Sequence, residues 1–247
     1  MVYLNAFRVD PDVGSSGAYF TDLPVVRLLR DMDWFPLEDP VTIFVGENGS
    51  GKSTLLDALA VRAGLNAEGG SRNFLFSTKA TESGLHQYLS LARTARERDG
   101  FFLRAESFYN AATYLDQLDD IPALSAKLKD SYGGVSLHEQ SHGESFLSLV
   151  HHRFHGRGLY ILDEPEAALS PTRQMALLVE FDRLVQADAQ LIIATHAPIL
   201  LAFPGAAIYE ITPEAIRRTV YEDTDHVRIT RRFLNDPEGM LLRLLET

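Results

Sequence analysis

The chain has 247 residues, no cysteine and a formal net charge of −11 at pH 7. This net charge disfavours the broad basic surface that binding to nucleic-acid phosphates requires, and it does not exclude a local basic patch. The absence of cysteine excludes a disulfide framework and thiolate metal sites, and residues 1–8 lack the pattern of a secretory signal. With 45% apolar residues, the chain can bury one sizeable core. We expect a cytoplasmic protein in which residues 1–247 form one domain.

Two aromatic pairs, Tyr19-Phe20 and Trp34-Phe35, lie in the first part of the chain. Rings of this kind fill a core or cover an edge strand, and packing is the role we favour for them. The alternative is that one ring stacks on a flat ligand such as a nucleotide base.

The most informative segment is a glycine-rich turn between an apolar, β-branched run and a helical pattern. Residues 46–53 read Gly-Glu-Asn-Gly-Ser-Gly-Lys-Ser. The glycines let the backbone wrap closely, so that N–H groups and a helix N-terminus face phosphate oxygens. Lys52 adds a charge near the β and γ phosphates, and the hydroxyl of Ser53 is placed to bind Mg²⁺. The segment predicts a nucleoside triphosphate site at Gly46, Asn48, Gly49, Ser50, Gly51, Lys52, Ser53 and Thr54.

Residues 77–140 are expected to form a helical insertion subdomain within the single domain. Apolar residues recur there at helical spacing, at Leu85, Tyr88, Leu89, Leu91 and Ala92 and again at Leu115, Leu118, Ile121 and Leu124. The pair Ile121-Pro122 marks a break in the second series. No long heptad array is present in the sequence, which excludes a coiled-coil arm.

A second phosphate-binding turn is suggested by Gln140-Ser141-His142-Gly143-Glu144-Ser145, which precedes an apolar helical pattern. Ser141 and Gly143 suit a helix N-terminus built to hold phosphate, although the segment alone also fits an ordinary capped helix start. Its place shortly before an acidic strand favours the phosphate interpretation. Histidines 151, 152 and 155 follow on this helix, and without further ligands nearby they favour a structural role over a metal site.

Two buried strands in the second half of the chain end in polar residues. The run 159–162 leads into Asp163 and Glu164, and the run 190–194 leads through Thr195 into His196. In a parallel sheet such ends meet at the ligand crevice. Asp163 would hold the hydration shell of Mg²⁺, and Glu164 would face the γ phosphate and orient or deprotonate water. The position of His196 favours a contact with the γ phosphate.

Apolar residues continue to Ile208, but Pro198 and Pro204 interrupt them, so we expect a loop and a short helix rather than a membrane span. Five arginines near the end alternate with acidic residues, which favours a solvated face over a nucleic-acid patch. The segments 233–234 and 240–245 predict a terminal amphipathic helix docked on the core.

The order of these motifs resembles the ABC-type ATPases, and the resemblance covers most of the chain from Val41 to His196. Within that superfamily the chain is most similar to stand-alone cytosolic members related to the chromosome-maintenance, RecF-like and OLD-like ATPases, including small bacterial ATPases. Two features carry this choice: the signature segment ends in Gly143-Glu144, and residues 163–171 read Asp-Glu-Pro-Glu-Ala-Ala-Leu-Ser-Pro. Transporter subunits usually continue their signature with a Gln-Arg pair that this chain lacks.

The resemblance implies an α/β fold, with a mainly parallel sheet covered by helices, an antiparallel β portion and a helical insertion. It implies Mg²⁺-dependent ATP hydrolysis, with Ser53 and Asp163 serving the metal, Glu164 activating water and His196 sensing the γ phosphate. Ser141, Gly143 and Glu144 would contact ATP held by a second copy of the chain, so that ATP closes a head-to-tail homodimer that acts as a switch. A role in nucleic-acid maintenance or defence, with DNA or a partner protein, is one hypothesis from the resemblance.

Two other functions remain open: the nucleotide-binding subunit of a membrane transporter, and a nucleotide-gated binding module with negligible turnover. The chain also departs from the family pattern. His142 replaces a common glycine, and Ser170 stands where many relatives carry aspartate. No glutamine is evident for the loop that usually couples the site to its partner, and Arg104 and Glu106 are the candidates for that position.

Overall fold

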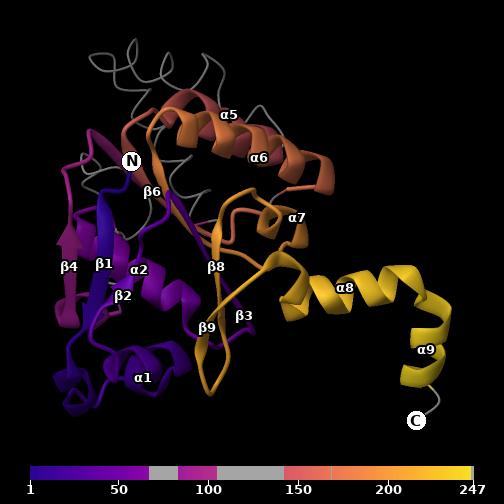
Figure 1. The fold of residues 1–247 in the computed structure, drawn as a ribbon, viewed down its shortest axis with the longest axis horizontal. Coiled ribbons are helices and arrows are strands. Elements are labelled where there is room, and N and C mark those ends of the chain that lie inside the picture. The colour runs from indigo at the N-terminus through magenta and orange to yellow at the C-terminus, as the bar shows by residue number, and fades with distance from the viewer. Residues whose placement is uncertain (67–82, 105–141, 168, 246–247) are drawn as a thin grey trace.

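The computed structural model describes residues 1–66, 83–104, 142–167 and 169–245 (Figure 1). Ser141, Glu106 and the apolar series at 115–124 lie outside these ranges, as does most of the expected insertion at 77–140. The described residues form two β-sheets with helices packed against them.

The larger sheet has six strands in the order β5-β6-β7-β3-β8-β9. Its strands are β3 (Val41–Gly46), β5 (Asp99–Arg104), β6 (Gly158–Asp163), β7 (Gln190–Ala194), β8 (Ala207–Ile211) and β9 (Ile216–Thr219). Neighbouring strands are parallel from β5 through β8, and β9 alone pairs antiparallel. The predicted parallel-dominated α/β sheet is confirmed.

A second, three-stranded sheet is antiparallel, with the order β2-β1-β4. It consists of β1 (Leu4–Val9), β2 (Phe35–Pro36) and β4 (Leu89–Arg93). This sheet is the antiparallel portion that the sequence predicted. The helical periodicity expected at residues 85–92 is wrong, however, because a 3₁₀ turn, η3 (Leu85–Tyr88), leads directly into β4. Pairing of β4 with β1, with Leu91 opposite Phe7, overrides the local spacing.

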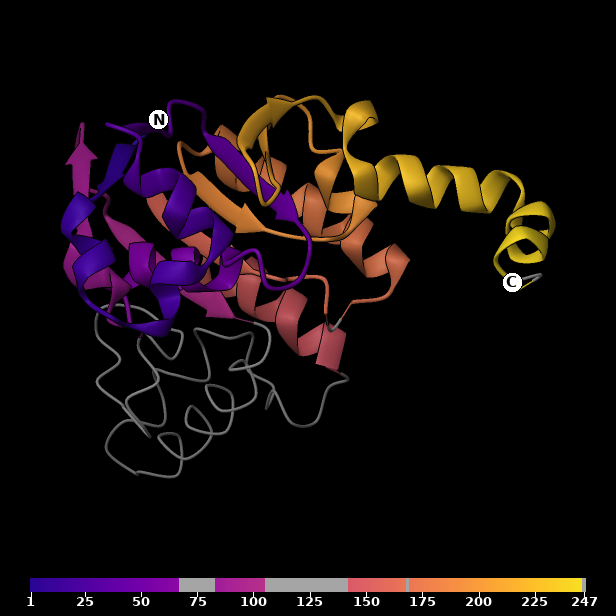
Figure 2. The same ribbon diagram turned by 90° about the horizontal axis from the view of Figure 1, so that it is seen from below.

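The α-helices of the described residues are distributed over both sides of the larger sheet and beyond its end. They are α1 (Pro24–Arg30), α2 (Lys52–Ala63), α5 (His142–Arg153), α6 (Pro171–Gln186), α7 (Pro198–Leu201), α8 (Asp225–Asn235) and α9 (Pro237–Leu245). Short 3₁₀ turns are η1 (Pro11–Ser15), η2 (Tyr19–Asp22) and η5 (Tyr221–Asp223). Figures 1 and 2 show α5 and α6 side by side on one face, with α1 and α2 on the opposite side.

Alternating side chains of the central strands build a core on each face of the larger sheet. Ile43, Tyr160 and Ile193 pack with α5 and α6, whereas the neighbouring residues Phe44 and Ile161 pack with α2 and the smaller sheet. Successive side chains of a strand point to opposite faces of the sheet, so a strand whose side chains are all apolar is buried on both faces. The sheet is therefore the rigid base on which the strand ends are held.

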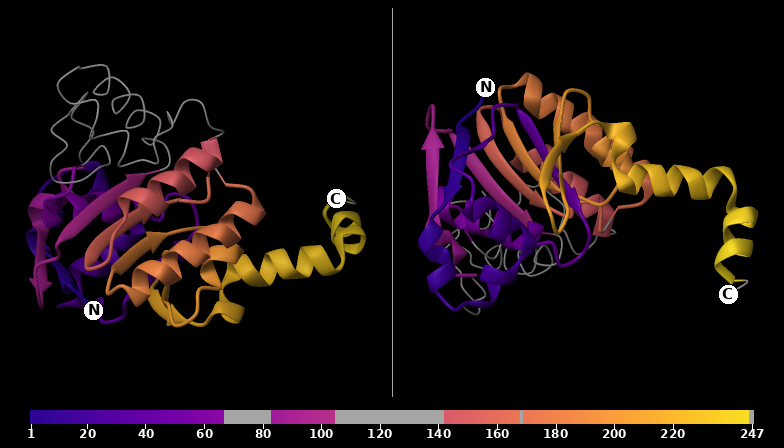
Figure 3. Two further views of the ribbon diagram at one scale, coloured as in Figure 1. Left: turned by 90° about the horizontal axis from the view of Figure 1, so that it is seen from above. Right: turned by 60° about the horizontal axis from the view of Figure 1, so that its bottom comes forward.

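The C-terminal helices project from this body. Figures 1, 2 and 3 show α8 leaving the end of the sheet and α9 turning away from it. Val227 is the buried residue of α8, and α9 has none. The prediction of a single terminal helix that docks on the core is wrong, because the segment forms two helices and α9 does not pack on the core. An apolar stripe shows that a helix is amphipathic but does not determine what covers that stripe. Within the described ranges, no helix combines the length and apolar content that crossing a bilayer demands.

Candidate functional site

Three neighbouring strands bring the predicted motifs to one edge of the sheet. Asp163, at the end of β6, is in register with Ala194 at the end of β7, and Ala194 also pairs with Phe44 of β3. The loop that follows β3 and the residues that follow β6 and β7 therefore leave the sheet at the same level. This is the carboxyl edge at which open parallel sheets bind ligands.

The phosphate loop folds as predicted, from the end of β3 to the start of α2 at Lys52. Gly51 has a φ of 94°, a left-handed conformation in which a side chain is disfavoured. A Cβ atom at Gly51 would also lie 2.6 Å from Cγ1 of Val25, because the N-terminus of α1 presses against the loop. The backbone N–H of Val25 donates to the carbonyl of Ser50 at 3.0 Å, which fixes this contact. The glycine is required both by the turn and by the close approach of α1.

Lys52 is 4% exposed and lies across its own loop. Its Nζ donates to the carbonyl oxygens of Gly46 at 2.7 Å and Glu47 at 3.1 Å, and to Oγ of Ser50 at 3.3 Å. Burial lowers the pKa of Lys52, and the carboxylates of the site act in the opposite direction. Asn48 and Gly49 form the exposed tip of the loop, and Thr54 follows in the first turn of α2. The ammonium group is held within the loop, where phosphate oxygens would accept hydrogen bonds from it.

Ser53 and Asp163 form the pair that fits a magnesium ion. Oγ of Ser53 donates to Oδ1 of Asp163 at 3.0 Å, and the Asp163 side chain is almost fully buried. Burial raises the pKa of Asp163, and the nearby guanidinium of Arg104 is the largest opposing influence. A hydroxyl and a carboxylate are hard oxygen ligands, and Mg²⁺ bound to substrate phosphates commonly takes one or two such protein groups. The donor set therefore fits the metal.

Glu164 adopts an uncommon backbone conformation directly after Asp163. Its φ is 50°, and its N–H donates to the carbonyl of Ala194 at 2.9 Å, which ties it to the end of β7. A non-glycine residue with positive φ costs free energy and is found disproportionately at functional sites. The side chain is 42% exposed, so solvent can reach the carboxylate. The conformation is consistent with a residue placed for chemistry.

His196 lies between two acidic side chains and a second histidine. Its Nε2 is 3.5 Å from Oε1 of Glu164, and its backbone N–H donates to Oε1 of Glu166 at 2.7 Å. Its Nδ1 lies 2.9 Å from Nε2 of His226. Burial lowers the pKa of His196 to about 4, and the charges of Lys52 and His226 act in the same direction. The ring is therefore neutral near pH 7, with a single N–H to donate.

Three residues of the site were not assigned by sequence reasoning. Arg104 was weighed only as a coupling residue, and the structure places its Nε 3.3 Å from Oδ2 of Asp163. Glu166 supports the backbone of His196, and its place two residues after Glu164 was the available signal. His226 had no signal, because nothing in a sequence shows that a residue thirty positions after His196 returns to it.

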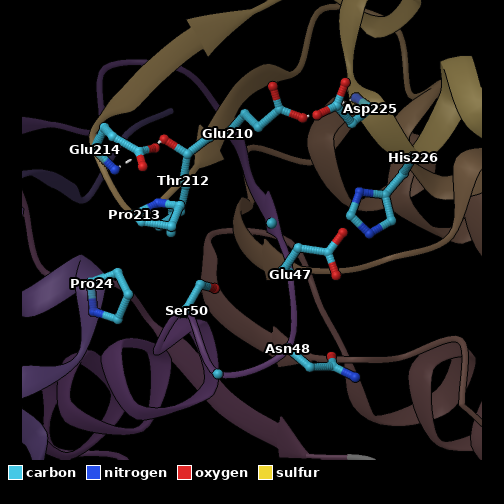
Figure 4. Close-up of a pocket in the computed structure, with 13 residues that line it drawn as sticks. Pro24, Glu47, Asn48, Ser50, Glu210, Thr212, Pro213, Glu214, Asp225 and His226 are labelled. Carbon is cyan, nitrogen blue, oxygen red and sulfur yellow. Dashed lines mark hydrogen bonds between the residues drawn. The ribbon is translucent and has the colours of Figure 1, made fainter.

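A cavity of about 400 Å³ adjoins the phosphate loop (Figure 4). The loop forms one wall, and the turn between β8 and β9, the start of α1 and the start of α8 form the others. Carboxylates of Glu47, Glu210, Glu214 and Asp225 line it, and the Asp225 N–H donates to Oε1 of Glu210 at 3.0 Å. Its volume is in the range of small-molecule pockets.

Neither predicted aromatic pair is among the residues that line this cavity. Phe20 and Phe35 are buried in the core beside the smaller sheet, at 3% and 2% exposure, whereas Tyr19 and Trp34 are exposed. Packing, the role favoured from the sequence, holds for Phe20 and Phe35.

The signature residues lie at the start of α5, apart from Ser141, which is outside the described ranges. Gly143 is buried, and Oε1 of Glu144 lies 2.9 Å from a guanidinium nitrogen of Arg173 on α6. Their predicted contact with nucleotide held by another copy stays a prediction. Histidines 151, 152 and 155, of which the last lies beyond the end of α5, are not part of any metal-binding cluster in the described ranges, and Nδ1 of His151 lies 2.8 Å from Oε1 of Glu180.

Two protein-family models match the chain. A model described as an AAA domain matches residues 26–130. Another model of AAA domains, whose description refers to the AbiEii toxin of type IV toxin–antitoxin systems, matches residues 96–202. Together the two matches run through every motif from the phosphate loop to His196.

Curated relatives include proteins whose names refer to transport. The chain is 27% identical over 193 residues to the galactose/methyl galactoside import ATP-binding protein MglA of Haemophilus influenzae, covering 70% of this chain and 36% of that protein. It is 25% identical over 186 residues to the ABC transporter G family member STR2 of Medicago truncatula, covering 70% and 26%. The chain thus spans about a quarter to a third of the length of the curated relatives it matches.

Solved structures with a similar arrangement include a metal-chelate type ABC transporter in an inward-facing conformation, at 16% identity and a TM-score of 0.49, covering 93% of this chain and 88% of that one. An ATP-binding cassette of an ABC transporter gives 16% identity and a TM-score of 0.48, covering 93% and 99%. The order of its motifs, the geometry of its site and the two matching AAA-domain models together support an ABC-type P-loop ATPase.

Proposed function

We propose that this chain is a stand-alone, cytoplasmic, Mg²⁺-dependent ATPase that works as a switch. The observation that carries the proposal is the meeting of Ser53, Asp163, Glu164 and His196 at one edge of the sheet, beside the phosphate loop. Hydrolysis of a phosphoric anhydride needs a loop that binds phosphates, ligands for a metal ion, a general base and a neutral hydrogen-bond donor. These residues supply all four.

Each residue has a distinct part in the proposed reaction. The loop residues and Lys52 hold the β and γ phosphates, and Ser53 and Asp163 would hold Mg²⁺, which would supply positive charge against the phosphates. Glu164 accepts a proton from a water molecule whose oxygen attacks the γ phosphorus. The bond to the oxygen that bridges the β and γ phosphates breaks, and ADP leaves with that oxygen. His196 donates its N–H to the γ phosphate, where negative charge has to be stabilised.

We extend the proposal to a head-to-tail homodimer in which Ser141, Gly143 and Glu144 of one copy contact ATP bound to the other. The position of Gly143 and Glu144 in the first turn of α5 supports this, because the positive end of the dipole of a twelve-residue helix attracts an anion. Loss of the γ phosphate would remove the bridge between the copies and open the dimer.

Steady-state ATP hydrolysis by the purified chain tests the proposal, with Glu164→Gln as the key variant and Glu222→Gln, at an exposed residue, as the control. We expect turnover that requires Mg²⁺, falls at least about 100-fold in Glu164→Gln and is unchanged in the control. Light scattering should show the Glu164→Gln protein as a dimer in ATP and Mg²⁺ and as a monomer in ADP. Tight ATP binding with no turnover by the wild type would instead indicate a nucleotide-gated binding module.

A second candidate, the nucleotide-binding subunit of a transporter, is favoured by what the curated relatives are called. Adding linear double-stranded DNA to the hydrolysis assay separates this candidate from a role in nucleic-acid maintenance or defence. Stimulation by DNA would support the maintenance or defence role. A turnover rate that DNA does not change but that a co-purified membrane protein increases would support the role of a transporter subunit.

A further inference from the structure

His226 reaches the nucleotide site from a distant part of the chain. It lies in the first turn of α8 and lines the cavity beside the phosphate loop (Figure 4). Its Nε2 is 2.9 Å from Nδ1 of His196, and the two ring centroids are 5.0 Å apart at an angle of 50°. The ring contact is therefore a directed hydrogen bond between nitrogens and not a stack.

The turn that carries His226 is anchored on both sides. Thr224 is fully buried, and its hydroxyl donates to the carbonyl of Tyr221 at 2.9 Å. Val227 is 2% exposed in the core that α5 and α6 cover. The Asp225 N–H donates to Glu210 of β8 at 3.0 Å. These contacts hold the start of α8 in place relative to the sheet. The fold itself therefore positions His226 beside His196.

The hydrogen bond between the two rings constrains where the single proton of His196 lies. A neutral imidazole carries one N–H and one lone pair, so in each ring one nitrogen donates and the other accepts. If Nδ1 of His196 donated to His226, its Nε2 would turn a lone pair toward Oε1 of Glu164, 3.5 Å away. The same lone pair would repel a γ phosphate. This arrangement would also leave an N–H on Nδ1 of His226, a buried atom without a partner in the described ranges.

Nε2 of His196 is likewise a buried atom without a hydrogen-bond partner in the described ranges, so both arrangements leave one ring N–H unbonded, and they differ in whether that N–H lies beside the carboxylate of Glu164. If Nε2 of His226 donates, Nδ1 of His196 accepts, and the proton of His196 must lie on Nε2, on the side of Glu164. An N–H in that position faces an acceptor and can donate to phosphate. Glu166 holds the backbone N–H of the same residue at 2.7 Å, so both the ring and the backbone of His196 are oriented from outside.

We propose that His226 is a positioning residue for ATP hydrolysis: by donating to Nδ1 of His196 it fixes the tautomer that presents Nε2–H to the γ phosphate. The inference rests on the proposed ATPase function. It also links the nucleotide site to the projecting helices, because any displacement of α8 that parts the two rings removes the donor. His226 touches no phosphate in this scheme and acts through His196.

Ring ¹⁵N chemical shifts of His196 test the tautomer without any turnover. The resonance is assigned with His196→Gln, and the nucleotide-free wild type is compared with His226→Phe, His226→Gln and the exposed control His152→Phe. We expect the wild type and the control to carry the proton on Nε2. His226→Phe, which offers no donor, should shift the proton partly or wholly to Nδ1, whereas the amide N–H of His226→Gln should keep it on Nε2.

Kinetics supply the second readout. Since a displaced proton weakens a contact with the transition state, kcat of His226→Phe should fall at least about tenfold while KM for ATP changes little. His226→Gln should recover most of the loss, and unfolding curves identify any variant that fails to fold.

Two results would overturn the proposal: a wild-type proton on Nδ1 of His196, or equal losses of kcat in His226→Phe and His226→Gln with the tautomer unchanged, which would mean that His226 only fills space. If the wild type hydrolysed no ATP, the proposed function would fail, and the ¹⁵N shifts would still decide whether His226 sets the tautomer.

Discussion

The hydroxyl of Ser53 donates a hydrogen bond of 3.0 Å to Asp163, although 110 positions separate the two residues. One follows the phosphate loop in α2, and the other ends β6. Their meeting depends on the strand order, which places β7 between β3 and β6 and brings all three carboxyl ends to one edge. Because Ser53 and Asp163 are the proposed oxygen ligands of Mg²⁺, the magnesium requirement is the first property to test.

Replacing Asp163 with asparagine keeps the shape of the side chain but removes the negative charge that would face Mg²⁺. We expect the Mg²⁺ concentration for half-maximal ATP hydrolysis to rise at least about tenfold, the scale found when support for a bound metal is removed. A magnesium titration of turnover at fixed ATP measures this. Asp182→Asn, at an exposed position on α6, is the control. An unchanged magnesium requirement in Asp163→Asn would place the metal elsewhere.

Lys52→Met removes the ammonium group from the centre of the phosphate loop and keeps an unbranched stem of similar length. Because the three hydrogen bonds of Nζ lie within the loop, the change should spare the sheet and act on phosphate binding. We expect the dissociation constant for ATP, measured by calorimetry, to increase at least about tenfold, a loss of roughly 1.4 kcal/mol. Arg62→Met, exposed near the end of the same helix, should bind like the wild type. Equal affinities for both variants would contradict the assigned role of Lys52.

The phosphate loop and the acidic strand were predictable because their chemistry is local. A glycine turn that must hold phosphate stands between its own strand and helix, and Asp163 and Glu164 directly follow the strand that places them. The buried strands were readable for a similar reason, since neighbours such as Ile43 and Phe44 are both apolar and face different cores. In each case the residues that decide the structure are adjacent in sequence.

The features that sequence reasoning missed depend on distant partners. Leu89 and Leu91 belong to a strand because β1 lies beside them, which their own spacing does not reveal. The pairing of His196 with His226 depends on where α8 starts relative to the sheet. The same holds for Arg104, which becomes a neighbour of Asp163 only through the register of β5 on β6.

Tyr160→Phe tests how much the buried hydroxyl of Tyr160 stabilises the fold. This residue lies in the core between the larger sheet and helices α5 and α6. The Tyr160 hydroxyl donates to Oδ2 of Asp99 at 3.1 Å or to the carbonyl of His155 at 2.7 Å, and it accepts from the His155 N–H at 2.6 Å. Burial raises the pKa of Tyr160, so the hydroxyl stays protonated. In Tyr160→Phe, Asp99 keeps its hydrogen bonds from Arg153, but the N–H and carbonyl of His155 lose this partner, and we expect the free energy of unfolding to fall by about 1–3 kcal/mol. Urea unfolding measures the loss, and Tyr19→Phe, at a residue 68% exposed, should show none.

The low pKa of His196 makes stability depend on pH in a defined window. The ring has a pKa of about 4 in the folded chain against an ordinary value of 6.5, mainly because burial disfavours its charged form. Between these values the unfolded chain binds a proton that the folded chain does not, so the free energy of unfolding decreases as the pH falls from 6.5 toward 4.

The variant His196→Asn cannot titrate there. We therefore expect the stability of the wild type relative to His196→Asn, measured by urea unfolding, to diminish steadily from pH 6.5 to pH 4.5. The buried carboxyls Asp163 and Glu166, whose pKa values are raised by burial, oppose this trend, but they are present in both proteins and largely cancel in the difference. A difference that does not vary with pH would show that His196 titrates normally.

Truncation of the C-terminal helices tests how far the fold depends on them. Because no residue of α9 is buried, deleting residues 237–247 should change the free energy of unfolding by no more than about 0.5 kcal/mol, the range of ordinary surface substitutions. Deleting residues 225–247 also removes the buried Val227 and should cost at least about 1.5 kcal/mol. Urea unfolding of the two truncated chains and the wild type gives both values. A loss of several kcal/mol on removing α9 alone would mean that in solution it packs on the core, as its amphipathic sequence first suggested, and does not project from it.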